Sequence, residues 1–135
     1  MSENVLKLLD LRFVSFNFEN LSNKKGFETE LNIEYDINFV IDKTNNDKVK
    51  IDFKVKIVSK DELLSLNLDT IGEFQIDSKN IEPSVKEFVL KRNTIAIMFP
   101  FIRSQISLLT TQPGLQPIML QPIDVNKLEV KQKID

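Results

Sequence analysis

An alternation of apolar and polar residues in two segments, 30–41 and 49–57, constrains the fold more than any other feature of this chain. The apolar members of its first half are Leu31, Ile33, Tyr35, Ile37, Phe39 and Ile41. Those of its second half are Val49, Ile51, Phe53, Val55 and Ile57. A period of two is that of a β-strand with one buried face, and Asn45-Asn46-Asp47 between the halves favours a turn. The pattern predicts an antiparallel hairpin with one buried face and one wet face.

Two more strands are expected around this hairpin. Residues 7–18 are rich in apolar and aromatic side chains, and alternation places Leu11 and Phe13 on one face. The opposite face would then carry Val14, Phe16 and Phe18. This strand is therefore expected to be covered on both sides. Residues 64–76 alternate as well, with Gly72 as a plausible bulge. Four antiparallel strands result.

The second half of the sequence changes to helical spacing. Residues 84–90 favour a short helical turn, and residues 93–111 a longer helix with Asn93 as its N-cap and Pro100 as a kink or start. The apolar stripe of the longer helix consists of Ile95, Met98, Phe99, Ile102, Ile106 and Leu109. Further apolar residues on its other sides are Ile97, Phe101 and Leu108. A helix that is apolar nearly all round needs burial from more than one side. A single sheet covers one side, so the pattern predicts an oligomer.

The C-terminal part is expected to contain a stiff loop and a final helix. Residues 113–122 hold three prolines and a glycine, and Asp124 is suited to cap a helix that runs to Lys133 with Val125 and Leu128 facing inward. The predicted fold is a single α+β domain over residues 1–135. It has a four-stranded antiparallel sheet with one long helix and a C-terminal helix packed on it.

Composition excludes several classes of function. The chain has no histidine, no cysteine and only three glycines. The commonest general base, the thiol nucleophile, most zinc ligands and phosphate-binding loops are therefore missing, which leaves paired carboxylates as the remaining catalytic option. We expect no enzyme activity, no cofactor and no metal. A formal net charge of −2 argues against nucleic acid as a partner.

The N-terminus lacks the features of a signal peptide, and no apolar run approaches the ~20 residues that span a bilayer. A cytoplasmic protein without membrane insertion is the expectation.

Two stretches resemble the most distinctive segments of the SecB family of chaperones. They are Phe99-Pro100-Phe101-Ile102-Arg103 and the stretch from Leu115-Gln116-Pro117-Ile118 to Asp124. In the N-terminal half, Phe16-Asn17-Phe18-Glu19 and the segment from Phe27 to Glu34 are similar to the family's first two strands. The resemblance spans nearly the whole chain in the same order. It implies a four-stranded antiparallel sheet backed by helices, with subunits paired through their sheets and two pairs enclosing the long helices as a homotetramer.

The resemblance also implies a function. SecB-like proteins hold unfolded or nascent polypeptides in apolar grooves without ATP, for protein export or for a toxin–antitoxin partner. Carried over by position, the groove would be lined by Phe27, Leu31, Ile33, Tyr35 and Leu128. The oligomer contact would use Ile95, Met98, Ile102, Ile106 and Leu109. Inward residues of an alternating strand are more often core than groove. An adaptor of the same fold that recognises a single partner is the alternative function.

One departure from the family concerns the wet face of the sheet. Export-dedicated members dock the translocase motor through acidic residues at positions that correspond to Ser15, Glu19 and Asn67. Only Glu19 retains an acid, and three lysines add positive charge to the same predicted face, namely Lys50, Lys54 and Lys56. The sequence therefore predicts a partner-docking face that binds the export motor weakly.

Overall fold

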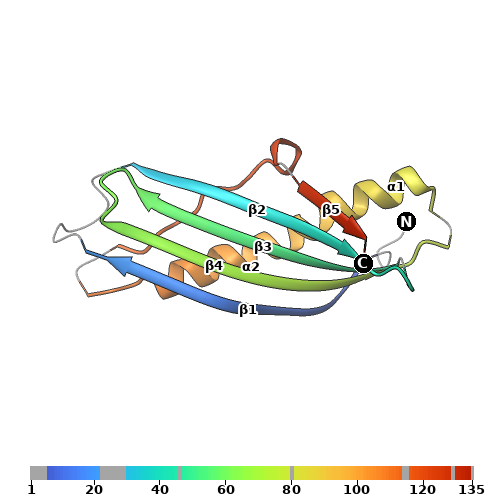
Figure 1. Cartoon of the computed structure of the whole chain (residues 1–135), viewed down its shortest axis with the longest axis horizontal. Coiled ribbons are helices and arrows are strands. Elements are labelled where there is room, and N and C mark those ends of the chain that lie inside the picture. The colour runs from blue at the N-terminus through green and yellow to red at the C-terminus, as the bar shows by residue number, and fades with distance from the viewer. Residues whose placement is uncertain are drawn as a thin grey trace.

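A long twisted β-sheet with a helix across one face forms the framework of the molecule (Figure 1). The computed structural model describes residues 6–21, 30–45, 47–79, 81–113, 116–128 and 130–134. The first four strands are β1 (Leu6–Asn20), β2 (Leu31–Ile41), β3 (Lys48–Ser59) and β4 (Leu64–Ile76). The helical elements that follow are α1 (Pro83–Phe88), η1 (Val89–Asn93), α2 (Thr94–Leu109) and η2 (Val125–Lys127). Strand β5 (Val130–Ile134) comes last.

The central hairpin has the register that its alternation predicts. Strands β2 and β3 pair antiparallel without interruption from Leu31 opposite Ser59 to Ile41 opposite Val49. The turn is closed by the Lys48 amide, which donates to the Asn45 carbonyl at 2.9 Å. The sheet order is β1-β4-β3-β2-β5, and β1, β4, β3 and β2 are mutually antiparallel. The predicted four-stranded antiparallel sheet with one long helix is confirmed.

Strand β1 departs from simple alternation at two points. Its register against β4 shifts between Leu8 and Asp10 and again between Phe13 and Ser15. Each shift inserts one extra residue, as a β-bulge does, and reverses the face of every residue that follows. Phe13 and Phe16 consequently lie opposite the buried residues Thr70 and Leu68. The apolar residues that pack partly against the core are Leu6, Leu8, Leu11, Phe16 and Phe18. The expectation of a strand covered on both faces, with Val14 beside Phe16 and Phe18, was wrong.

Gly72 allows the helix to approach the sheet closely. It continues the regular ladder between Leu11 of β1 and Ile51 of β3, so the bulge expected there does not form. A Cβ atom at this position would lie 2.9 Å from the sulfur of Met98 in α2. Met98 is fully buried, and the missing side chain makes room for it. The glycine therefore serves helix–sheet packing and does not interrupt the ladder.

The helical segment is longer than predicted. The π-helical turn η1 joins α1 to α2, so Asn93 lies within helical backbone and makes no side-chain cap. Pro100 lies inside α2 and neither starts nor ends it. The side of α2 that packs on the sheet carries four fully buried apolar residues, which are Ile95, Met98, Ile102 and Ile106. The helix therefore forms one half of the core of its own protomer.

The expected C-terminal helix from Asp124 to Lys133 was wrong. The short turn η2 forms there, and β5 then pairs parallel with β2, from Val130 beside Ile37 to Ile134 beside Ile41. The sequence already carried a period-two signal, since the apolar residues Leu128, Val130 and Ile134 all fall on even positions and the residues between them are polar. The open edge of β2 supplies hydrogen-bond partners that favour the extended form. A long-range contact thus decided between helix and strand.

Candidate polypeptide-binding and docking surfaces

An apolar stretch at the start of β2 lies on the same face of the sheet as the core. This stretch, the β2 strip, consists of Leu31, Ile33 and Tyr35, whose partners on β3 are the buried Ser59, Ile57 and Val55. Further along β2 on the same face, Ile37 and Phe39 are fully covered, whereas Ile33 is 39% exposed. The apolar face of β2 therefore opens toward its N-terminal end and presents accessible surface continuous with the core.

Tyr35 connects the β2 strip to the long helix. Its ring stands edge-on to Phe53 of β3, with centroids 5.9 Å apart, and edge-on to Phe99 of α2, with centroids 6.1 Å apart. Such perpendicular pairs add to the stabilisation from burial alone. Burial also raises the pKa of the Tyr35 hydroxyl above its ordinary value, so this side chain stays neutral at physiological pH. Tyr35 is therefore an uncharged side chain through which β2 packs against α2.

A second apolar hollow, the α2 groove, lies between α2 and the proline-rich segment that follows it. It encloses about 720 Å³, and its apolar lining includes Phe99, Pro100, Leu108, Met119, Ile123 and Val125. The segment is fastened to the helix because the Ile118 amide donates to Thr110 Oγ1 at 2.8 Å. Leu108 is 70% exposed and Met119 57% exposed. Since Phe99 lines this groove and also contacts Tyr35, the two apolar surfaces meet at one aromatic pair.

The predicted groove residues are partly brought together. Leu31, Ile33 and Tyr35 form the β2 strip, but Leu128 lines a different hollow together with Phe88. Phe27 lies outside the described residues. The sequence did not indicate the α2 groove, because its apolar residues come from a helix and from an irregular segment that share no common period.

The residues predicted for the oligomer contact occupy the sheet side of α2. Ile95, Met98, Ile102 and Ile106 are fully buried within the protomer, and Leu109 is partly buried. The four fully buried residues are therefore not available to a second subunit. The large apolar residues of α2 that are exposed are Phe101 and Leu108. Helical spacing identifies an apolar stripe but does not tell whether the chain's own sheet or a partner covers it.

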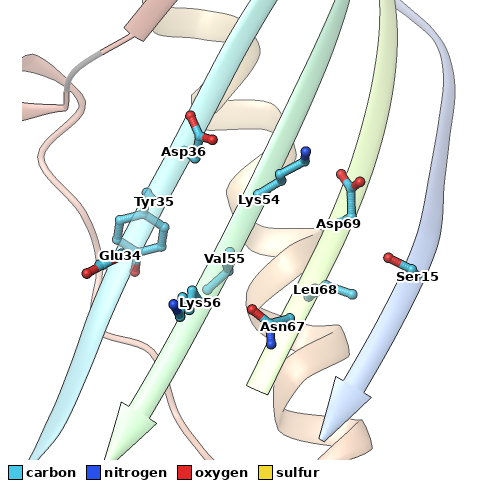
Figure 2. Close-up of a pocket in the computed structure, with 10 residues that line it drawn as sticks. All are labelled: Ser15, Glu34, Tyr35, Asp36, Lys54, Val55, Lys56, Asn67, Leu68 and Asp69. Atoms are coloured by element: carbon cyan, nitrogen blue, oxygen red, sulfur yellow. The ribbon is translucent and has the colours of Figure 1, made fainter. Parts of the chain in front are cut away.

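The outer face of the sheet, opposite α2, carries the predicted docking residues. Ser15 and Asn67 line one hollow there, as Figure 2 shows, and Glu19 lies on the same face because it is opposite Ser65 in the β1–β4 ladder. All three residues therefore lie on the face that the sequence predicts to be wet. Lys50, Lys54 and Lys56 of β3 lie there too, and each of these three has an acidic cross-strand neighbour: Glu34 for Lys56, Asp36 and Asp69 for Lys54, and Glu73 for Lys50. The face therefore bears alternating charges and is not a basic patch.

Asp52 and Asp69 form a carboxyl pair on this outer face that sequence reasoning missed. They lie on the neighbouring strands β3 and β4, and the Oδ1 atom of each is buried without a hydrogen bond from a donor in the described part of the chain. Burial, a hydrogen bond with Asp52 and the charge of Asp52 raise the pKa of Asp69 to about 6, while Lys54 acts in the opposite direction. The neighbouring Asp52 carboxylate therefore favours the protonated form of Asp69. Only the strand register reveals the pair, because the two residues are far apart in sequence.

This pair predicts a pH-dependent stability. The folded state keeps a proton on Asp69 up to a pKa of about 6 where an ordinary aspartate loses it near 3.8, so the free energy of unfolding falls as pH rises through this window. We expect Asp69→Asn to raise the Tm at pH 8 by about 3 °C and to change it little at pH 4. This corresponds to roughly 1 kcal/mol after allowance for solvent screening. Differential scanning calorimetry at both pH values is the measurement, with the exposed Asp77→Asn as control. An effect of the Asp69→Asn change that is equal at both pH values contradicts the assignment.

Comparison with known proteins decides the family. A family model described as "Preprotein translocase subunit SecB" matches residues 4–134. The chain belongs to the SecB family. SecB proteins are non-enzymatic chaperones, which agrees with the expectation of no enzyme activity. Within the described residues no helix has the length and apolar character that a membrane span requires.

Curated SecB relatives are similar over most of this chain. The protein-export protein SecB of Rickettsia bellii (strain OSU 85-389) is 31% identical over 115 residues, which cover 85% of this chain and 62% of the relative. The protein-export protein SecB of Rickettsia typhi is 30% identical over the same shares of both chains. This SecB-family chain thus spans about 62% of the length of these curated relatives.

A solved structure of similar fold is the SecB-like chaperone of Mycobacterium tuberculosis in complex with a ChAD peptide from the HigA1 antitoxin. It superimposes with a TM-score of 0.69 and 11% sequence identity, and the match covers 88% of each chain. At this identity the likeness establishes the fold alone. It agrees with the antiparallel sheet and long helix described above.

Proposed function

We propose that this SecB-family chain is an ATP-independent holding chaperone that binds unfolded or nascent polypeptides on accessible apolar surface. The observation that carries the proposal is the contact of Tyr35 with Phe99, where the β2 strip and the α2 groove meet. Two open apolar surfaces joined in this way suit a long extended segment better than a compact small molecule. No nucleotide is needed for such binding.

The physical basis of holding is the burial of apolar surface. Each 100 Å² of apolar area removed from water contributes about 2.5 kcal/mol, whichever apolar side chain supplies it. Ile33 and Met119 are both substantially exposed, so a client would remove from water area that the folded chain leaves accessible. Binding of this kind has little sequence preference, which is the property that a holding chaperone requires.

Two client classes are compatible with the family. The Rickettsia relatives are named as protein-export proteins, and the Mycobacterium tuberculosis neighbour is described as bound to an antitoxin peptide. We propose unfolded proteins, either for export or for a toxin–antitoxin partner, as the clients here. The second candidate function is an adaptor for a single partner, and the single antitoxin peptide bound by the solved neighbour supports it.

We further propose that the chain assembles as a homotetramer, a dimer of dimers. Strand β1 is an edge of the sheet with Leu9, Phe13 and Val14 exposed, and α2 exposes Phe101 and Leu108. An open edge strand and an exposed apolar helix face are both surfaces that a second subunit commonly covers. They supply the two different contacts that a dimer of dimers needs.

The outer face is proposed as the partner-docking face, with Ser15, Glu19 and Asn67 as its candidate residues. Ser15 and Asn67 are exposed but uncharged, and the lysines nearby are balanced by acids. Electrostatic complementarity sets association rate and partner choice. A translocase motor that selects acidic surface would therefore associate weakly with this face.

A panel of clients tests the proposed function. Aggregation of several unrelated, chemically unfolded proteins is followed by light scattering with and without the chain, and with and without ATP. We expect suppression of aggregation for all of them at near-stoichiometric ratios, unchanged by ATP. Suppression for one protein alone would favour the adaptor. Dependence on ATP, or no suppression at all, would overturn the proposal.

A further inference from the structure

The last strand of the chain occupies the edge of the strand that carries the candidate binding surface. Strand β5 pairs with β2 over five residue pairs, from Ile37 beside Val130 to Ile41 beside Ile134. The β2–β3 ladder, by contrast, extends over the whole of β2. In Figure 1 β5 lies at the margin of the sheet, at the end of the segment that returns from α2. It is a short addition at one end of β2.

We propose that β5 is a displaceable internal strand, and that an extended segment of a client polypeptide binds by pairing with the β2 edge in its place. The inference rests on the proposed function and adds how a client is held. The occupant is an unfolded polypeptide in extended form, since the edge already accepts such a segment from this chain. The backbone hydrogen bonds of an added strand are independent of sequence, which suits a binder of many clients.

The connection of β5 to the turn η2 limits how much of β2 it can pair with, and a separate client polypeptide has no such limit. The chain reaches β5 from the turn η2, and the pairing of β5 with β2 begins only at Ile37. A separate polypeptide that runs in the same direction has no such connection to η2. It could pair with Ile37–Ile41 and also continue past Tyr35 toward Leu31. Its apolar side chains would then adjoin the β2 strip, whose Ile33 is accessible. A client thus gains backbone pairs beyond the five of β5, together with apolar contact to the β2 strip.

An internal occupant also explains how an open edge is tolerated. Unpaired strand edges promote association between copies of a protein, and natural sheets cover them. Because β5 is tethered, its effective concentration at the edge is high, and it covers β2 when no client is present. The apparent affinity for clients is reduced by the fraction of time that β5 is paired. If β5 is paired about nine-tenths of the time, release of β5 strengthens client binding about tenfold.

A proline pair in β5 tests the inference. Successive backbone N–H groups of a strand point in opposite directions, so one of the two in Lys131→Pro/Gln132→Pro removes a hydrogen bond to β2. The matched control, Lys131→Ala/Gln132→Ala, keeps both N–H groups. The probe is a dye-labelled, reduced and carboxymethylated lactalbumin, followed by fluorescence anisotropy. We expect the proline pair to lower the Kd about tenfold and the alanine pair to stay within twofold of the unaltered chain.

Hydrogen exchange of the unaltered chain provides a second measurement that needs no variant. On addition of the probe, amides of Val130–Ile134 should lose protection while those of Ile37–Ile41 keep it. The inference is overturned if the β5 amides stay protected in the complex, or if a folded proline variant binds no more tightly than the unaltered chain. If the proline variant unfolds, the exchange result decides. If the unaltered chain binds no unfolded polypeptide at all, the proposed function fails, and this inference fails with it.

Discussion

Replacing Leu108 with lysine is expected to break the oligomer while the protomer stays folded. Leu108 is 70% exposed on α2, so the protomer loses little when it is changed. A lysine buried without a partner in a subunit contact costs several kcal/mol. Multi-angle light scattering at micromolar concentration should give about four times 15.6 kDa for the unaltered chain and a smaller mass for the variant.

Two further variants make this experiment decisive. Asn93→Lys adds the same charge at an exposed position of η1 and should leave the mass unchanged. Ile106→Lys should abolish the fold itself, because Ile106 is fully buried in the protomer. A mass near 15.6 kDa for the unaltered chain would rule out the oligomer. A Leu108 variant that keeps the full mass would place the contact elsewhere.

Ile33→Glu is expected to weaken the binding of unfolded polypeptide at least tenfold, which corresponds to about 1.4 kcal/mol. Ile33 is the exposed member of the β2 strip, and a carboxylate there would have to be desolvated beneath an apolar client. A change at Tyr35 would test client binding less well. Its ring packs against both Phe53 and Phe99, so its loss would also disturb the core. Fluorescence anisotropy with a labelled unfolded protein measures the effect.

The neighbouring residue supplies the matched control. Asn32→Glu adds the same charge one position away on the same strand, where the side chain is exposed on the opposite face. It should leave client affinity within twofold. Circular dichroism should give equal secondary structure for both variants. Equal weakening by both would show a general charge effect and remove the β2 strip from the site.

The hairpin of β2 and β3 was predictable because its information is local. Alternation fixes which residues of a strand are buried, and Asn45-Asn46-Asp47 marks the turn, so the structure needs no distant contact to be inferred. The helical spacing around Ile95 and Ile102 is equally local. The elements that were inferred correctly are those in which a single period runs without interruption.

The features that sequence reasoning missed depend on distant contacts. Strand β5 forms because it pairs with the edge of β2. The residues from Val130 to Ile134 do not by themselves indicate that this edge is available. The Asp52–Asp69 pair requires the register of β3 against β4. The β2 strip was located by resemblance. Its partial exposure depends on the packing of β2 against α2, which meets the strip at Tyr35 and leaves Ile33 accessible.

The two bulges of β1 have a consequence for how this strand evolves and is compared. Leu9 and Val14 have no partner in the β1–β4 ladder, so β1 contains two residues more than the pairing with β4 requires. Losing either one would shorten the strand and leave every remaining residue opposite its present partner. A loss at any other position would turn the following side chains to the wrong face until the next bulge. Gaps between related sequences are therefore tolerated at these two points, and residues such as Ser15 can be equated across relatives only after the bulges have been counted.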